Sequence, residues 1–100
     1  MDKDPLETIR RLDPEFYDRV SQSRDYTFKD GALPAKVKYL IAMVIDAVHG
    51  AAGGVSSLAR QAVQHGASKD EIMEALHVAS FLGGVGSVYT ASFGLGELFE

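Results

Sequence analysis

Residues 65–76, HGASKDEIMEAL, contain the most informative local pattern in the chain. The pair His65-Gly66 predicts a helix end, because glycine adopts the backbone conformation that terminates helices and a basic side chain favours the negative end of the helix dipole. Ser68 and Glu71 have the spacing of a capping box, in which each side chain binds the other residue's backbone N–H. The stretch therefore predicts two helices joined by a short turn, with His65 in a capping role.

The patterns on either side of this turn extend both helices. After Ser68, one helix face is apolar and the opposite face is charged up to Gly83-Gly84, which predicts the helix end. The apolar face carries Ile72, Leu76 and Ala79, and the charged face carries Lys69, Asp70 and Glu74. Before the turn, the spacing of an amphipathic helix recurs at Val55, Leu58, Ala59, Ala62 and Val63. Gly50, Gly53 and Gly54 indicate a chain break before that helix.

Three more helix starts precede that break. Asp4-Pro5 and Asp13-Pro14 each place an N-cap acceptor before a proline at the first helical position. The second of these helices carries Phe16 and Val20 and is expected to run through Phe28, until Asp30-Gly31 ends it. The third opens at Leu33-Pro34 and is apolar nearly all round over residues 39–48, with one interruption at Asp46. We therefore expect it to be the central buried helix.

A last helix is predicted from about Val85 to Phe99. Gly86, Thr90 and Gly94 recur in it at every fourth residue, so another helix backbone could approach this side closely. The chain has no alternating strand pattern and no internal repeat. We predict an all-α fold of about six helices in one domain over residues 1–100, with N-terminal helices over 1–30 and a core over 31–100.

The composition excludes several classes of protein. The chain has 100 residues, a formal charge of −4 and no cysteine. A hydrophobic share of 46% argues against global disorder. The absence of a basic cluster argues against nucleic-acid binding. Without cysteine, disulfides, thiolate metal sites and thiol peroxidase chemistry are excluded.

A membrane segment is not expected either. Residues 78–96 carry no charge, but five glycines interrupt the run and leave too little apolar transfer energy for a transmembrane helix. The charged N-terminal stretch MDKDPLETIRR lacks the apolar run of a signal peptide, so we expect a cytoplasmic protein.

Several stretches resemble the carboxymuconolactone decarboxylase family, which includes alkylhydroperoxidase D. The resemblance covers about residues 28–95. Its most specific parts are the entry at residues 28–33 (FKDGAL), the helix-turn-helix at 65–75 (HGASKDEIMEA), and Gly83-Gly84 before Tyr89. The resemblance implies an all-α fold and assembly as trimers or hexamers.

The resemblance also implies where the family's chemistry would lie. The peroxidase branch uses a glutamate, a Cys-x-x-Cys pair and a histidine as a proton relay. Here Tyr39 stands at the glutamate position, Ala51 and Gly54 at the cysteine positions, and Leu58 at the histidine position. Alanine and glycine cannot replace a thiolate nucleophile, so peroxidase activity is disfavoured. The decarboxylase branch needs no cysteine, although it usually keeps the histidine.

Tyr39, Asp46 and His49 form the sharpest candidate catalytic set. Tyr39 and Asp46 are about two helical turns apart on one face, and His49 lies one turn beyond Asp46. A histidine oriented by a carboxylate is a plausible general base, and a phenol can donate a hydrogen bond to a substrate oxygen. The alternative is that Asp46 and His49 cap helices or bridge helices or subunits.

Four further residues are candidate substrate contacts, each with a structural alternative. Ser56 and Ser57 follow the double glycine and could hold an anion, or could simply cap the helix. His77 could line a pocket or make a hydrogen bond within the core, and Tyr89 could offer its hydroxyl to a cavity or pack between helices. The three histidines lack metal-ligand spacing, so we predict no metal and no cofactor.

Two functional hypotheses follow from this sequence. In the first, the protein is a cofactor-free, non-redox enzyme, of lyase type if it is an enzyme at all, or a binder of a small carboxylated or lactone-like molecule. In the second, it is a non-catalytic oligomeric scaffold or interaction protein. Self-association is expected in both, because short helices with small-residue faces are combined with apolar residues near the C-terminus that we expect to be exposed: Phe93, Leu95, Leu98 and Phe99.

Overall fold

Six helices account for the regular structure of residues 4–99, the part of the chain that this computed structural model describes. They are α1 (Glu7–Leu12), α2 (Pro14–Phe28), α3 (Ala35–Val48), α4 (Ala52–Gln64), α5 (Lys69–Gly83) and α6 (Gly86–Leu95). The predicted all-α, single-domain fold is confirmed. Within residues 4–99, no helix has both the length and the hydropathy needed to span a bilayer.

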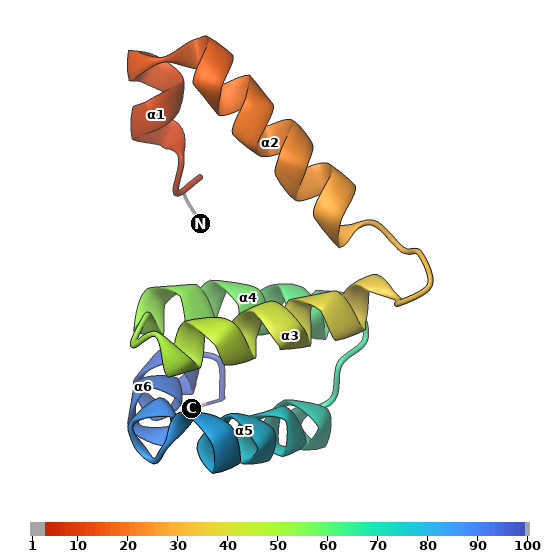
Figure 1. Ribbon diagram of the computed structural model, residues 1–100, viewed down its shortest axis with the longest axis vertical. Helices are drawn as coiled ribbons and strands as arrows, with labels where there is room; N and C mark the ends of the chain where they lie inside the picture. The colour runs from red at the N-terminus through yellow and green to blue at the C-terminus, as the bar shows by residue number, and fades with distance from the viewer. Residues whose placement is uncertain (1–3, 100) are drawn as a thin grey trace.

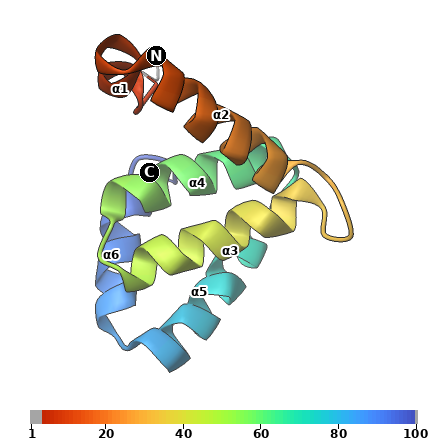
Figure 2. The same cartoon turned by 45° about the horizontal axis from the view of Figure 1, so that its top comes forward.

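The helices form an arm and a core. Helices α1 and α2 make up the arm, which stands away from the rest of the chain and contacts it mainly where α2 approaches α3 (Figures 1 and 2). Helices α3 and α4 lie side by side, and α5 and α6 pack on the side away from the arm. No residue of α1 or α2 is buried. The arm therefore contributes little to the hydrophobic core.

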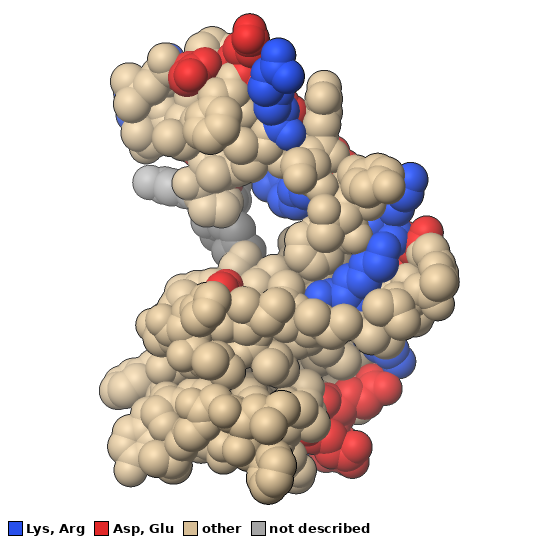
Figure 3. Space-filling view, viewed as in Figure 1, with Lys and Arg blue, Asp and Glu red and all other residues tan. Residues whose placement is uncertain are grey.

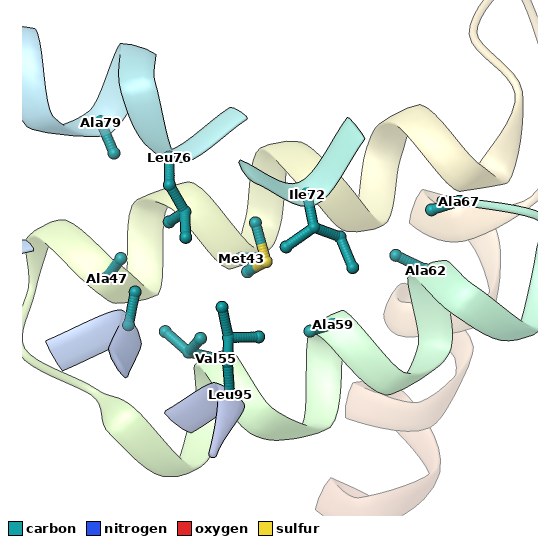
Figure 4. Packing of buried hydrophobic residues seen from close by; sticks show 11 residues of the cluster. Met43, Ala47, Val55, Ala59, Ala62, Ala67, Ile72, Leu76, Ala79 and Leu95 are labelled. Carbon is teal, nitrogen blue, oxygen red and sulfur yellow. The ribbon is translucent and has the colours of Figure 1, made fainter. Parts of the chain in front are cut away.

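The core is centred on side chains from α3, α4 and α5. Met43, Val55 and Ile72 are its largest fully buried residues, and their side chains point toward one another (Figure 4). Helix α6 closes one end of this cluster. A Cβ atom at Gly94 would lie 2.6 Å from the carbonyl oxygen of Ala52, so the predicted close helix approach is confirmed there. At Gly86, a Cβ atom would meet nothing within 4 Å.

The predicted helix ends follow local hydrogen bonds. The backbone N–H of Glu71 donates to the Ser68 hydroxyl at 3.0 Å, and the Ser68 N–H donates to the Glu71 carboxylate at 2.9 Å, which completes the capping box. At the start of α2, the carboxylate of Asp13 accepts from the N–H of Phe16 at 3.1 Å. Gly66 and Gly84 have φ angles of +101° and +87°, a conformation that favours glycine. These bonds fix the starts of α2 and α5, and the two glycines end α4 and α5.

Three predictions about single elements were wrong. Helix α4 begins at Ala52, because Gly50 reverses the chain directly after α3; Ser56 and Ser57 therefore lie inside the helix and do not cap it. Helix α6 ends at Leu95 rather than Phe99. Leu95 is only 8% exposed, because it packs into the core of its own chain, and so it does not belong to an exposed C-terminal surface.

The prediction that α3 is the central buried helix holds for its position but not for its whole surface. Helix α3 contacts α4, α5 and α6, which bury Met43 and Ala47, but none of them covers its remaining side. Ile41, Ile45 and Val48, spaced along that side, are 46%, 49% and 44% exposed. The helix is central in position, yet it leaves a row of apolar side chains at the surface of the chain.

Candidate ligand-binding cleft

A cleft of about 830 Å³ lies between the arm and the layer formed by α3 and α4 (Figure 3). The cleft exists because the arm contacts the core mainly where the C-terminal end of α2 approaches α3. Its lining residues come from the arm and its C-terminal end (Pro5, Leu6, Arg24, Asp25, Phe28 and Lys29), from α3 (Tyr39 and Asp46) and from α4 (Gly53, Gly54, Ser57, Leu58 and Gln61). The cleft therefore joins segments far apart in sequence.

Tyr39 is held at one end of the cleft by two neighbouring rings. The ring of Phe28, the last residue of α2, stacks on it with centroids 4.4 Å apart and planes within 5°. The ring of His65 packs against it with centroids 5.0 Å apart, tilted by 33°. Among residues 4–99 the hydroxyl of Tyr39 has no hydrogen-bond partner. The ring is thus fixed in place while the phenolic group stays available to a ligand.

Asp46 lies further along the same face of α3, against the first turn of α4. A Cβ atom at Gly54 would clash with its carboxylate, so the carboxylate fits there only because residue 54 has no side chain. The N-terminus of α4 carries the positive end of the helix dipole, which favours a carboxylate at this place. No described residue donates a hydrogen bond to this carboxylate, which therefore has acceptor capacity for a ligand.

Tyr39 and Asp46 cannot easily reach the same atom of a small ligand. Seven helical residues separate them, which corresponds to about 10 Å along the axis of α3. We therefore expect the two groups to contact opposite ends of a bound molecule.

One face of helix α4 lines the cleft. Gly54, Ser57, Leu58 and Gln61 follow the i, i+3, i+4, i+7 spacing of a single helix face. Ser57 was predicted from the sequence as a substrate contact and it does line the cleft. Gln61 was missed, although its position on the stripe of Ser57 could have indicated it.

The arm and its C-terminal end add two cationic side chains, Arg24 and Lys29, that the sequence analysis did not name as site residues. Arg24 lines the cleft with 45% of its side chain exposed and lies 3.9 Å from the carboxylate of Asp25. Lys29 lines the cleft and places its ammonium group 4.7 Å from the centre of the Tyr26 ring. Nothing in the spacing of α2 distinguishes Arg24 from the other arginines of the arm, so only the packing of the arm over the core reveals it.

The remaining predicted site residues lie outside the cleft lining. His49 is the exposed C-cap residue of α3, and its ring makes no hydrogen bond with Asp46. Ser56 is half-buried on α4, and His77 and Tyr89 are exposed on α5 and α6. The structure thus brings Tyr39, Asp46 and Ser57 to one cleft, and it places His49, Ser56, His77 and Tyr89 elsewhere.

The other features of residues 4–99 offer less chemistry. A smaller cavity of about 360 Å³ between α5 and α6 has a mainly apolar lining that includes Met73, Leu76 and Phe99. No group of three or more histidine and acidic side chains capable of holding a metal ion occurs in this range. The cleft beside the arm is therefore the candidate site.

Comparisons with known proteins agree with this architecture. The sequence profile of the carboxymuconolactone decarboxylase family matches residues 14–95, so its match includes α2 as well as the core. A crystal structure of a carboxymuconolactone decarboxylase family protein from Legionella pneumophila is similar, with a TM-score of 0.84 and 31% identity. The similarity covers 91% of this chain and 81% of that chain. No curated protein matches.

An all-α core with a cleft beside α3 and α4 defines the class of protein: a small all-α protein with a candidate ligand site between its N-terminal arm and its core. The chain belongs to the carboxymuconolactone decarboxylase family. Of the four relay positions that the family resemblance indicated, Tyr39, Gly54 and Leu58 line the cleft and Ala51 is the N-cap residue of α4. Three of these four positions therefore lie in the cleft, and the chain has no thiol at any of the four.

Proposed function

We propose that this protein binds a small carboxylated or lactone-like molecule in the cleft and acts on it without a cofactor or a thiol. One observation carries the proposal: Tyr39 and Asp46 line the same cleft, and neither the Tyr39 hydroxyl nor the Asp46 carboxylate has a hydrogen-bond partner among the described residues. Polar groups in a cleft that lack internal partners are suited to binding a ligand.

The roles of the groups follow from their chemistry. The carboxylate of Asp46 can accept a proton, and the phenol of Tyr39 can donate a hydrogen bond to a carbonyl or lactone oxygen at the other end of the molecule. Arg24 and Lys29 supply positive charge for a carboxylate of the ligand. The reaction class that we propose is a cofactor-free lyase reaction; thiol peroxidase chemistry needs a nucleophilic sulfur that this chain does not have.

The test is thermal unfolding with and without a panel of small lactones, carboxylates and quinone-like aromatics. A ligand at a hundred times its dissociation constant should add about 2.7 kcal/mol to the free energy of unfolding. Tyr39→Phe and Asp46→Asn should each weaken the shift. Asp18→Asn, which changes an exposed carboxylate of α2 outside the cleft, should leave it intact.

A variant of His49 distinguishes two versions of the proposal, one with Asp46 as the base and one with His49 as the base. With Asp46 as the base, His49→Ala should retain turnover, because the exposed ring lies outside the cleft lining. Loss of turnover in His49→Ala together with retained turnover in Asp46→Asn would transfer the role of base to His49. A panel without any shift would contradict ligand binding altogether.

A second candidate function is a non-catalytic oligomeric scaffold. One observation favours it: many large apolar side chains of α3, α5 and α6 are exposed in the single chain. A scaffold would give no ligand shift but would still self-associate, so the two measurements together distinguish the candidates.

A further inference from the structure

The cavity of about 360 Å³ between α5 and α6 shares no lining residue with the cleft beside the arm. Lys69, Met73 and Leu76 line it from one face of α5, at the i, i+4, i+7 spacing of a helix. Ala91 and Leu95, one helical turn apart, line it from α6. The cavity is therefore a second candidate site, formed where two helices of the core pack together.

The interior of this cavity is apolar. Leu76, Ala91 and Leu95 belong to the hydrophobic core and are 6%, 1% and 8% exposed, so they form its deepest part. Met73 and Phe99 also line it but are 44% and 40% exposed, so the single chain leaves part of their apolar surface uncovered. Covering that surface with an apolar molecule is favourable, and a methionine side chain adapts its shape to what it contacts. The interior therefore suits a hydrocarbon group.

The edge of the cavity carries one positive charge. Lys69 is the only charged residue of the described chain that lines the cavity, and its ammonium group forms no ion pair with another described residue. Because Lys69 is exposed, its carbon chain can lie along the apolar surface while the ammonium group stays at the solvent boundary. Asp70 and Glu74, its acidic neighbours on α5, do not line the cavity, and Glu71 binds Lys36 at 3.0 Å. The positive charge of Lys69 is therefore available to an anion.

This combination of an apolar interior and a single cation specifies the chemistry of the ligand. A carboxylate matches one ammonium group in charge, whereas a phosphate monoester carries about −1.5 to −2 at neutral pH and would keep an excess of negative charge. Residues 69 and 76 are about 10 Å apart along the axis of α5, which leaves room for a hydrocarbon chain of moderate length beyond the carboxylate. The volume is near the lower limit of small-molecule pockets, about 300–1,000 Å³. The cavity therefore fits one chain of this kind.

We propose that the cavity between α5 and α6 binds a medium-chain aliphatic carboxylate. The carboxylate pairs with Lys69 at the solvent boundary, and the hydrocarbon chain packs against Leu76 and Leu95. This site is separate from the cleft, and the proposal does not rest on the function proposed for the cleft.

Titration calorimetry of the full chain with octanoate and with 1-octanol, both below the concentrations at which they aggregate, tests the two parts of the proposal. The wild type should bind octanoate about three- to tenfold more tightly than 1-octanol, because only octanoate can pair with Lys69. Lys69→Gln should remove this difference by weakening octanoate binding and leaving 1-octanol binding unchanged. Arg19→Gln, which removes an equal charge from an exposed residue of the arm outside both cavities, should retain the wild-type preference.

A second variant locates the bound chain. Ser92 is exposed and lines the cavity from α6, so the ring of Ser92→Phe can occupy the cavity without entering the core. This variant should bind octanoate and 1-octanol at least tenfold more weakly than the wild type. Ser23→Phe, at an exposed position of α2 outside both cavities, should bind them normally. Circular dichroism would show whether Ser92→Phe folds; the comparison in Lys69→Gln, a surface substitution, does not depend on it.

Four results would overturn the proposal. The first is a wild type that does not bind octanoate. The second is unchanged octanoate binding in a folded Ser92→Phe variant, which would place octanoate elsewhere, for example in the cleft. The third is equal weakening of octanoate and 1-octanol by Lys69→Gln. The fourth is octanoate binding that disappears as the protein concentration rises, which would show that a second copy of the chain occupies the cavity.

Discussion

The carboxylate of Asp46 lies against the α-carbon of Gly54, in the space that a side chain at position 54 would occupy. This contact joins the second half of α3 to the first turn of α4. It also sets the position of the only carboxylate that the core helices direct into the cleft among the described residues.

Replacing this glycine tests whether the position of Asp46 matters for ligand binding. In Gly54→Ala the new methyl group must push the Asp46 side chain aside, so ligand-induced thermal stabilisation should fall. Gly86→Ala is the control, because a Cβ atom there meets nothing within 4 Å and residue 86 lies outside the cleft lining. The control should show the same ligand-induced stabilisation as the wild type. Equal ligand shifts in both variants would show that the place of Asp46 is unimportant.

Close packing of α6 on α4 gives a second prediction. In Gly94→Ala the new methyl group would lie 2.6 Å from the carbonyl oxygen of Ala52 and 2.8 Å from the Cβ atom of Val55. Backbone cannot move aside cheaply, so we expect a loss of about 1–3 kcal/mol in the free energy of unfolding, measured in urea. Gly86→Ala, with open space around it, should unfold at a urea concentration close to that of the wild type.

The lowered pKa of Glu71 predicts how the free energy of unfolding changes at acidic pH. The backbone N–H of Ser68 and then the ammonium group of Lys36, 3.0 Å from the carboxylate, hold the pKa of Glu71 below its ordinary value of 4.5. The ionised Glu71 carboxylate therefore contributes its full share to the free energy of unfolding above pH 4.5. That contribution is lost as the pH falls through the lower pKa of the folded state.

Thermal unfolding from pH 7 to pH 3 checks this sign. Glu71→Gln keeps an acceptor for the capping box but loses the charge, so its melting temperature should fall less steeply with acid than that of the wild type. Ser68→Ala should cost about 1 kcal/mol by loss of the cap. Parallel pH profiles for wild type and Glu71→Gln would contradict the assigned role of the charge.

The stack of Phe28 on Tyr39 should hold the arm to the core. Because α1 and α2 bury no residue, Phe28→Ala should release the arm while leaving the unfolding transition of the core nearly unchanged. Limited proteolysis should then cut faster within residues 29–34. Leu12→Ala, which removes a side chain of α1 that is 74% exposed, is the control. Equal cleavage rates in the two variants would show that the stack does not restrain the arm.

The sequence by itself determined the helices and most of their ends. Asp13, Ser68, Glu71 and Gly84 act through hydrogen bonds or backbone angles that span at most four residues, so their effects can be read from neighbouring letters. The periodic apolar positions of α5 likewise identified the side that faces the core. The family resemblance also depended on these local signals.

Only the tertiary structure decided which groups share a site and which apolar side chains stay exposed. In the sequence, Asp46 and His49 are equally plausible polar site residues one helical turn apart. In the structure, Asp46 lines the cleft, whereas His49 is the exposed C-cap residue that follows α3. Arg24 enters the cleft because the arm folds back over the core, and Phe81 stays exposed because no other element of the described chain covers it. These outcomes depend on contacts between residues distant in sequence, which no local pattern encodes.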